Sequence, residues 1–490
     1  MIDKAANWIS ENSIQNQGII VNSRQRTPYP EVSGYFIPTL LSLVKINLAR
    51  QYSQWLISIQ NSDGSFSGPN GNNKYVFDTA QVIRGWVAIV DLMPELISPI
   101  RKACDWVIST ADPSTGRLLT PSFGGDWSLG RRGEVNEGIH LYALSPILSV
   151  AEKFNDSKLR KFVQKSLNHY LKYVQLTDFT LPNSLTHFYG YIQDSLFDLG
   201  LYDLAFNGMS SVAKYQQSSG AVPGYSDVNW VCSTGLAQLA IVWYKLGDLS
   251  RADASINFLQ KLQNPSGGFM GSYGIEANYF PSSEISWAVK YYIDASHLQI
   301  SKHFDSTVNQ YSSHIDKNDG RVKAIIAHLG DLNCKNILDA GCGKGSYSVI
   351  LKNLYPTSNI TAVDISEKML SYVPNNITKI QSSLLNIPLP NSTFDAIICI
   401  EALEHTVDIS RAISELCRNL SFDGTLIIID KNKCFKGTLE MPNWEKWFDL
   451  EEVTALLQIQ GLFVKTEFIS YDNHTEPDGL FICWVAKKIN

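Results

Sequence analysis

The sequence lacks three features that would place it in a membrane, on nucleic acid or outside the cell. It has no apolar run of the roughly 18–20 residues that span a bilayer, and residues 1–8 lack the apolar core of a signal peptide. It also has no basic tract: 41 Lys and Arg face 47 Asp and Glu, a net charge of −6. This argues against sequence-independent binding of nucleic acid or anionic lipid. We expect a cytoplasmic protein whose partners are small molecules or glycans.

Paired cysteines are missing as well. The eight cysteines are scattered, six of them after residue 330, with no Cys-x-x-Cys spacing. This pattern favours reduced core residues over a disulfide framework, and we expect no metal. With 490 residues, 44% of them hydrophobic and 18% charged, the chain should fold throughout into two or three domains. Nothing in the sequence predicts its oligomeric state.

A repeat of about 50 residues runs through the first 300 residues. Residues 55–66, Trp-Leu-Ile-Ser-Ile-Gln-Asn-Ser-Asp-Gly-Ser-Phe, recur at 258–269 as Phe-Leu-Gln-Lys-Leu-Gln-Asn-Pro-Ser-Gly-Gly-Phe. Weaker copies begin at Trp8, Trp106, Tyr170 and Val212. Each copy is typical of the end of an amphipathic helix followed by a glycine turn.

Six further helical segments, apolar on a wider face, lie between these copies. They start near Glu31, Asp78, Glu134, His187, Asn229 and Glu284. Their wide apolar faces predict buried helices. Twelve helices that alternate between exposed and buried resemble an (α/α)6 toroid, and the Gln, aromatic and Gly turns resemble those of terpene cyclases, protein prenyltransferases and carbohydrate-processing enzymes. The resemblance covers residues 1–297 and implies a ligand funnel at one end of the inner ring.

Polar residues at the starts of the predicted inner helices are the candidates for that funnel. They are Tyr29, Glu31, Tyr35, Tyr75, Asp78, Arg131, Arg132, Glu134, Glu137, His140, His187, Tyr189, Asp194, Asp227, Asn229, Trp230, Tyr279 and Glu284. A carboxylate in a first helical turn can also be a simple cap. The company of aromatic and His side chains resembles a saccharide cleft, in which Asp78 with Asp194, or His187 with Tyr189, could supply acid–base chemistry. The Asp-x-Asp-Asp acid of cationic terpene cyclases is absent, and two cysteines in this half do not predict zinc.

After residue 300 the pattern changes to short apolar runs that alternate with helices, which predicts a second domain. Residues 335–339 read as a strand, residues 340–345 (Ala-Gly-Cys-Gly-Lys-Gly) as a loop and residues 346–353 as a helix. Loop glycines can bring backbone N–H groups and a helix N-terminus against a ligand. Residues 360–364 read as the next strand and end in Asp364, about 20 residues after the loop, where ribose hydroxyls bind in nucleotide-type sites.

The loop pattern, Asp-x-Gly-x-Gly-x-Gly at 339–345, resembles the first motif of class I S-adenosylmethionine-dependent methyltransferases. The resemblance continues in order through a proline turn and strand at 386–400, a Glu-Ala-Leu-Glu-His loop at 401–405 and a strand at 424–430. It covers residues 302–490 and implies an α/β Rossmann-like domain that binds S-adenosylmethionine.

The resemblance also assigns cofactor contacts. The candidates are Asp339, Gly341, Gly343, Gly345, Asp364, Ile365, Ser383, Leu384, Glu401 and Tyr311. Asp339 and the first two glycines would cradle the methionine end, Asp364 would hold the ribose hydroxyls, and Ile365 and Leu384 would flank adenine. Ser383 departs from the acid that is common in the family at this position. Tyr311 resembles an aromatic residue that closes over the cofactor, with ordinary packing as the alternative.

Methyl transfer to a hydroxyl benefits from a base aligned with the acceptor. His405, just after the predicted fourth strand, is the first candidate, and Asp430, Lys431 and His474 are weaker ones. We therefore expect an S-adenosylmethionine-dependent methyltransferase that methylates a sugar hydroxyl in cell-surface polysaccharide or glycoconjugate assembly, with the toroid binding the glycan.

Two alternatives remain open. The toroid could be a hydrolase, lyase or epimerase on the same glycan, or a non-catalytic scaffold beside a methyltransferase for another small molecule or natural product. Convergence of Asp78, His187, Tyr189 and Asp194 in one funnel would favour binding or catalysis. Dispersal of the four side chains would favour a scaffold.

Overall fold

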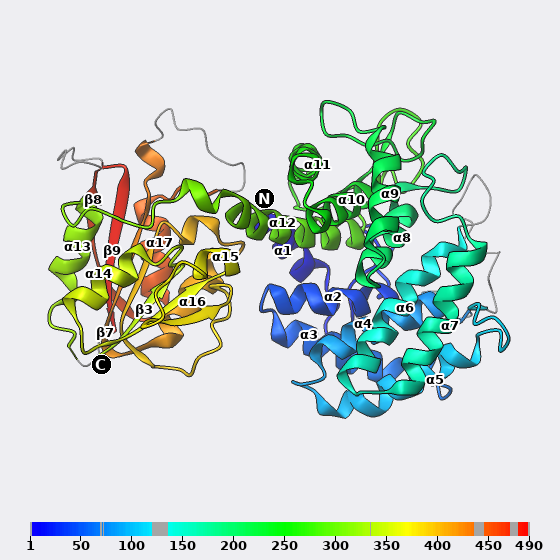
Figure 1. The fold of residues 1–490 in the computed structure, drawn as a ribbon, viewed down its shortest axis with the longest axis horizontal. Coiled ribbons are helices and arrows are strands. Elements are labelled where there is room, and N and C mark those ends of the chain that lie inside the picture. The colour runs from blue at the N-terminus through cyan, green and yellow to red at the C-terminus, as the bar shows by residue number, and fades with distance from the viewer. Residues whose placement is uncertain are drawn as a thin grey trace. The chain divides into compact units, whose positions relative to one another are not determined.

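The computed structural model describes residues 2–68, 71, 73–119, 136–333, 335–435, 445–470 and 479–488. The chain divides into two compact units, residues 1–299 and 300–490, and Figure 1 shows the first as helices and the second as a sheet with helices on both faces. In the described part of the chain, no helix combines the length and apolarity needed to cross a membrane.

The first unit is helical. Its α-helices within the described ranges are α1 (Ile2–Asn12), α2 (Pro30–Ser42), α3 (Ile46–Ile59), α4 (Val76–Ile89), α5 (Ile97–Ser109), α6 (His140–Lys153), α7 (Ser157–Tyr173), α8 (Thr186–Asp198), α9 (Tyr202–Ala213), α10 (Ser233–Leu246), α11 (Leu249–Leu262) and α12 (Ser286–Thr307). Short 3-10 helices lie at η1 (Pro94–Leu96) and η2 (Glu137–Ile139), and β1 (Val231–Cys232) pairs with β2 (Ser272–Tyr273).

Buried and partly exposed helices alternate along this unit, as the sequence predicts. Helices α2, α4, α6, α8 and α10 are buried along most of their length and contact one another in that order, and each also packs against the helix that follows it. Helix α12 contacts α2, since Thr39 Oγ1 of α2 donates to Asp294 Oδ1 of α12 at 2.7 Å. Glycine permits the closest approach: a Cβ at Gly85 of α4 would lie 2.1 Å from the Gly34 carbonyl oxygen of α2.

The repeated turn has a steric reason. Gly64, Gly220 and Gly267 have φ of +94°, +92° and +93°, and a Cβ on any of them would lie 2.0–2.3 Å from a backbone oxygen of another outer helix. Only glycine fits this conformation and this approach. The Gly267 turn packs on Lys4, so the last copy of the repeat contacts the first helix.

The predicted starts of the buried helices agree with the structure in four cases. Helices α2, α4, α8 and α12 begin at residues 30, 76, 186 and 286. Helix α10 begins at Ser233, because the two residues before it pair with β2. The predicted start at Glu134 lies outside the described residues, as do Arg131 and Arg132.

The second unit contains an α/β sheet. Its strands within the described ranges are β3 (Asn336–Ala340), β4 (Asn359–Asp364), β5 (Thr378–Gln381), β6 (Phe394–Ile400), β7 (Leu420–Lys431), β8 (Leu462–Ile469) and β9 (Phe481–Lys488). The helices are α13 (Gly320–Leu329), α14 (Ser346–Leu354), α15 (Glu367–Leu370), α16 (Ile409–Asn419) and α17 (Leu450–Ile459), with 3-10 turns η3 (Val308–Gln310), η4 (Leu403–His405) and η5 (Lys433–Phe435).

The strand order of this sheet is β5-β4-β3-β6-β7-β9-β8. The first five strands of that order are parallel, and β9 pairs antiparallel with both β7 and β8. Because parallel strands end at one edge, the segments after β3, β4, β6 and β7 lie at the same side of the sheet, where ligands bind in open α/β folds.

The boundary predicted from the sequence, between residues 297 and 302, lies inside α12. This helix runs through the division between the two compact units without a break. A change of hydrophobic pattern can mark a new domain, but it does not show whether the backbone between the domains is a loop or a helix.

Candidate functional site

The glycine loop follows β3 and enters α14, as predicted. Gly341, Gly343 and Gly345 have φ of +77°, +52° and +79°, a conformation that glycine adopts without strain. A Cβ at Gly341 would lie 2.3 Å from Ala402 Cβ, whereas a Cβ at Gly343 would meet no protein atom within 4 Å. The loop is therefore packed against the segment after β6 on one side and open on another.

Asp364, at the end of β4, is joined to this loop. The Gly343 N–H donates to Asp364 Oδ2 at 2.8 Å, and the Ser366 N–H donates to Asp364 Oδ1 at 2.9 Å. Burial raises the pKa of Asp364, and these backbone donors oppose the rise. Each carboxylate oxygen keeps a lone pair for a further donor, as the predicted contact with ribose hydroxyls requires.

Asp339, at the end of β3, is buried beneath the loop. Ser348 Oγ of α14 donates to Asp339 Oδ2 at 2.5 Å. Burial raises the pKa of Asp339 to about 7, with a smaller contribution from Asp364. A cationic ligand group would stabilise both carboxylates, so this acidic pair fits the ammonium and sulfonium charges of S-adenosylmethionine.

The predicted adenine side lies next to the same loop. Leu384 Cδ1 is 3.8 Å from the position of a Cβ on Gly341, and Ser383 Oγ accepts from the Leu385 N–H at 3.2 Å. Ile365, half-buried after β4, accepts from Gln381 Nε2 through its backbone oxygen at 3.2 Å. Glu401, with φ +50°, pairs with Arg321 of α13.

Tyr311 and its neighbour approach the start of α14. Lys344 Nζ donates to the Tyr311 carbonyl oxygen at 2.7 Å, and Ser346 Oγ donates to the Ser312 carbonyl oxygen at 3.2 Å. The Tyr311 side chain is 41% exposed, so its ring is not part of the core. The Tyr311 backbone lies beside Lys344 of the glycine loop.

His405 belongs to a buried cluster of charged groups after β6 and β7. Its Nε2 lies 3.2 Å from Glu404 Oε1, and its ring centroid lies 4.9 Å from that of Phe304. Burial lowers the pKa of His405, although Glu445 and other carboxylates oppose this. His405 follows Ala402, whose Cβ lies against Gly341, so the predicted base comes from the same edge of the sheet as Asp364.

Lys431 supplies the positive charge in that cluster. Its Nζ bonds Glu404 Oε1 at 3.1 Å and also contacts Glu445. Burial would lower the pKa of Lys431, but the two carboxylates outweigh it and raise the value. Burial raises the pKa of Glu404 to about 8. Glu404 therefore titrates near neutral pH, whereas the lowered pKa of His405 favours its neutral ring.

The weaker base candidates have other contacts or lie elsewhere. Asp430 is fully buried, and its carboxylate accepts from the Glu404 N–H at 3.1 Å and from the Lys431 N–H at 2.9 Å. Lys431 is held by the two glutamates. His474 lies outside the described residues.

Glu404, His405 and Glu445 also bring one possible metal ligand atom each to within 4.8 Å of one another. The Lys431 ammonium group contacts both glutamates, so each already has a cationic partner. A divalent ion bound between these groups would be repelled by that ammonium group.

In the helical unit, Glu31 and Asp78 form a buried acidic pair. The Tyr29 hydroxyl donates to Asp78 Oδ2 at 3.2 Å and also interacts with Glu31. Burial raises the pKa of Glu31 to about 7 and that of Asp78 well above its usual range. Neither acid is a helix cap, since the N-cap residues of α2 and α4 are Tyr29 and Tyr75.

Buried aromatic side chains lie in the same helical unit. Tyr35 is buried 6.0 Å from Tyr291, and its pKa rises through burial and the nearby Glu31. His187 lies 4.7 Å from Tyr191, and its Nδ1 is 2.8 Å from Gln238 Oε1. Burial lowers the pKa of His187 to about 4.

Three other funnel candidates, Tyr189, Asp194 and Glu284, make contacts that hold the helices together. Tyr189 donates to the Thr177 and Gly208 carbonyl oxygens, both at 2.8 Å, and Asp194 pairs with Lys245 at 2.7 Å. Glu284 accepts from Trp8 Nε1 at 2.7 Å and so links the last repeat to the first helix. Asp78, His187, Tyr189 and Asp194 thus have separate partners.

Three further candidates lie elsewhere in the unit. His140 is buried with its ring 6.0 Å from Tyr170, and Trp230 packs edge-on to Tyr225 at 5.7 Å. Glu137 pairs with Arg117 Nε at 2.9 Å in a surface pocket of about 530 Å³.

Sequence reasoning missed Glu404 and Glu445 as partners of His405. Glu404 directly precedes His405 in the Glu-Ala-Leu-Glu-His loop at 401–405. This position next to the predicted base could have identified it as a partner. Glu445 is 40 residues further on, and no local pattern connects it to His405.

Comparison with known proteins agrees with this geometry. Residues 338–428 match a family model described as a methyltransferase domain. A probable S-adenosylmethionine-dependent methyltransferase of Mycobacterium tuberculosis is 25% identical over 130 residues, which are 25% of this chain and 47% of that protein. The ubiquinone biosynthesis O-methyltransferase of Rickettsia canadensis is 29% identical over 166 residues, 29% of this chain and 69% of that protein.

A crystal structure of a SAM dependent methyltransferase from Aquifex aeolicus aligns with a TM-score of 0.31 and 21% identity, over 37% of this chain and 96% of that one. The chain spans about half the length of curated relatives that it matches. With the family match placed on the glycine loop, β4 and β6, the chain contains an S-adenosylmethionine-dependent methyltransferase domain, and S-adenosylmethionine is its cofactor.

Proposed function

We propose that the whole protein transfers a methyl group from S-adenosylmethionine to a hydroxyl oxygen of a sugar in cell-surface polysaccharide or glycoconjugate biosynthesis. In this proposal the first unit is an (α/α)6 toroid that binds the glycan, and the enzyme acts in the cytoplasm. One observation carries the transferase part: the glycine loop binds Asp364 through the Gly343 N–H and lies against Ala402, which leads into His405.

The reaction needs alignment and the removal of one proton. When bound, the cofactor supplies an electrophilic methyl group on a sulfonium sulfur. Asp339 and Asp364 would hold the polar groups of the cofactor, and His405 would accept the proton of the acceptor hydroxyl. The lowered pKa of His405 leaves its ring neutral at pH 7 and able to accept that proton. Glu404, 3.2 Å from His405 Nε2, orients the ring.

The sugar acceptor is supported by the composition of the helical unit. Glu31 and Asp78 bring two carboxyl groups together, and the rings of Tyr29 and Tyr35 lie in the same region, all of them at least half-buried. Saccharides are bound by such hydrogen bonds and by stacking on rings. The separate partners of Tyr189 and Asp194 favour a scaffolding role for these two residues over the hydrolase, lyase or epimerase alternative, because neither side chain is left for acid–base work.

A second acceptor class has its own support. The Phe304 ring lies 4.9 Å from His405, which favours an aromatic acceptor such as a phenol or quinol, and one relative is named a ubiquinone biosynthesis O-methyltransferase. In that case the helical unit is a scaffold.

The free state of all seven cysteines in the described ranges, six of them buried, supports a reducing compartment for either acceptor.

Methyl transfer from labelled S-adenosylmethionine to two acceptor panels tests the proposal. One panel contains nucleotide- and lipid-linked sugars, and the other contains phenols and quinols. We expect label in a sugar ether, lost in His405→Asn and with a raised KM for the sugar in Asp78→Asn. Label only in a phenol, with no effect of Asp78→Asn, would replace the sugar by the second acceptor class. No binding of S-adenosylmethionine at all would refute the transferase function.

A further inference from the structure

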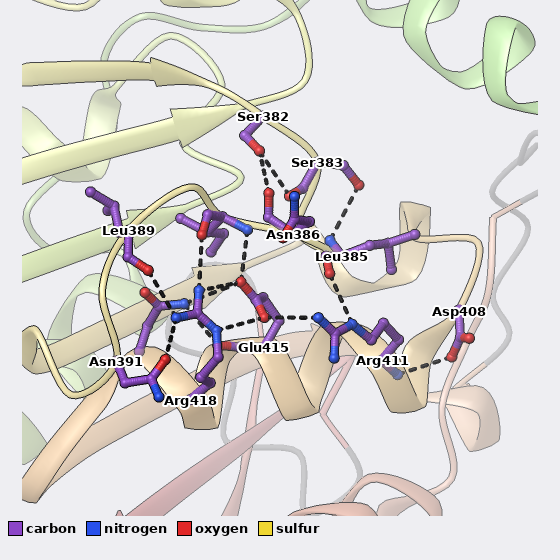
Figure 2. Close-up of polar contacts among 12 residues, drawn as sticks. Ser382, Ser383, Leu385, Asn386, Leu389, Asn391, Asp408, Arg411, Glu415 and Arg418 are labelled. Carbon is purple, nitrogen blue, oxygen red and sulfur yellow. Dashed lines mark hydrogen bonds and ion pairs between the residues drawn. The ribbon is translucent and has the colours of Figure 1, made fainter. Parts of the chain in front are cut away.

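The loop between β5 and β6, residues 382–393, is tied to helix α16 by one buried acid. Glu415 of α16 is fully buried, and Figure 2 shows it between Arg411 and Arg418, facing the loop. Burying a carboxylate is costly unless charged donors surround it, so the contacts of this side chain indicate why it is there.

Both oxygens of Glu415 are occupied. Oε1 accepts from the Ile387 N–H at 2.8 Å and from Arg418 Nη2 at 2.6 Å. Oε2 accepts from Arg418 Nε at 2.9 Å and from Arg411 Nη2 at 3.2 Å. Arg418 thus binds Glu415 through two parallel hydrogen bonds, the geometry that fixes a guanidinium group most firmly.

The two arginines also donate hydrogen bonds to the backbone of the loop (Figure 2). Arg418 donates to the carbonyl oxygens of Ile387 and Leu389 at 2.9 and 2.8 Å, and Arg411 Nε donates to the carbonyl oxygen of Leu385 at 3.0 Å. Three alternate carbonyl groups of the loop are therefore held by side chains that Glu415 itself orients.

The same loop reaches the glycine loop at its other end. The Ser382 N–H donates to the Asp364 carbonyl oxygen at 3.0 Å, and Leu384 lies beside Gly341. Leu384 directly precedes the first carbonyl group held by Arg411. The position of Leu384 against the glycine loop thus depends on the α16 contacts.

We infer that Glu415 is a positioning residue for the adenosine half of S-adenosylmethionine: it orients Arg411 and Arg418, which hold the loop that carries Ser383 and Leu384. This inference rests on the proposed role of Leu384 beside adenine. Glu415 does not touch the cofactor and takes no part in methyl transfer.

The substitution Glu415→Gln tests it in the full chain. Gln keeps the size of the side chain, but it replaces one acceptor oxygen by an NH₂ group that faces an arginine donor. We expect the Kd of S-adenosylhomocysteine to rise at least tenfold. The Kd of 5′-methylthioadenosine, which lacks the amino-acid half, should rise by a similar factor, while kcat at saturating S-adenosylmethionine stays within threefold of the parent.

Val453→Ala is the matched control. Val453 is fully buried in α17, and its truncation loosens the same unit without touching the loop. It should lower the melting temperature and leave the Kd of S-adenosylhomocysteine within twofold of the parent. A merely structural Glu415 would behave like Val453, so equal Kd values for Glu415→Gln and the parent would overturn the inference.

Two further outcomes have defined meanings. If Glu415→Gln does not fold, Arg411→Gln takes its place, since it removes the contacts to Leu385 and Glu415. Its Kd for S-adenosylhomocysteine is then compared with that of the parent. If the parent itself binds no S-adenosylhomocysteine, the proposed function fails and takes this inference with it. If the parent binds S-adenosylhomocysteine and the folded Glu415→Gln or Arg411→Gln variant binds it with the same Kd, only the inference fails.

Discussion

Replacing Gly343 by Ala separates cofactor binding from folding. Gly343 has φ +52°, and its added Cβ would meet no protein atom within 4 Å. The substitution therefore costs only the strain of a left-handed conformation, roughly 1–2 kcal/mol. The variant should remain folded at room temperature, with a lower melting temperature.

The effect on the cofactor is separate from this strain, which acts on the stability of the fold. The Gly343 N–H holds Asp364 at 2.8 Å, and the new methyl group would occupy the open side of the loop, where the cofactor backbone contacts are expected. We predict that the Kd of S-adenosylhomocysteine rises at least tenfold, about 1.4 kcal/mol, in isothermal titration calorimetry.

Gly461→Ala provides the control for this prediction. Gly461 has φ +78° and also no protein atom within 4 Å of an added Cβ, but it follows α17 and lies outside the proposed site. It should show a similar loss of melting temperature and an unchanged Kd. By contrast, Gly341→Ala would place its Cβ 2.3 Å from Ala402 Cβ and should destabilise the unit. A folded Gly343→Ala with parental affinity would refute the reasoning.

Four further predictions concern charged groups. Asp364→Ala should weaken cofactor binding at least tenfold, since each charged hydrogen bond contributes about 1.5–3 kcal/mol; a change below twofold in calorimetry would count against the ribose contact. Because burial raises the pKa of Asp339 to about 7 and a bound cation favours the carboxylate, the affinity for S-adenosylmethionine should rise as pH increases toward 7. Asp339→Asn should remove that slope, and a persistent slope would assign it to another group. His405→Asn should lower kcat at least a hundredfold and leave the Kd of the cofactor within twofold; a kcat near the parent's would exclude a base at this position. Folding raises the pKa of Glu31 from 4.5 to about 7, so its contribution to stability is complete below pH 4.5 and is lost as pH rises through 7. Glu31→Gln should flatten the melting temperature across this interval, and an unchanged pH profile would contradict the assignment.

The sequence by itself determined the local elements of both units. The glycine turns at Gly64 and Gly267 mark helix ends because only glycine accepts a φ near +93° against a neighbouring carbonyl group. The loop at 339–345 was recognisable for the same reason, since its conformation and its close approach to Ala402 both require glycine. The alternation of narrow and wide apolar faces likewise predicted which helices are buried.

Only the tertiary structure decided which side chains share a site. The sequence offered Asp78 and Asp194 as a possible acid–base pair, yet one lies with Glu31 and the other pairs with Lys245. Glu445 reaches Lys431, and Glu415 reaches the loop before β6, across strands that no local period relates. Periodicity follows from backbone geometry over a few residues, whereas these pairs depend on strand order and on which buried charge finds a partner.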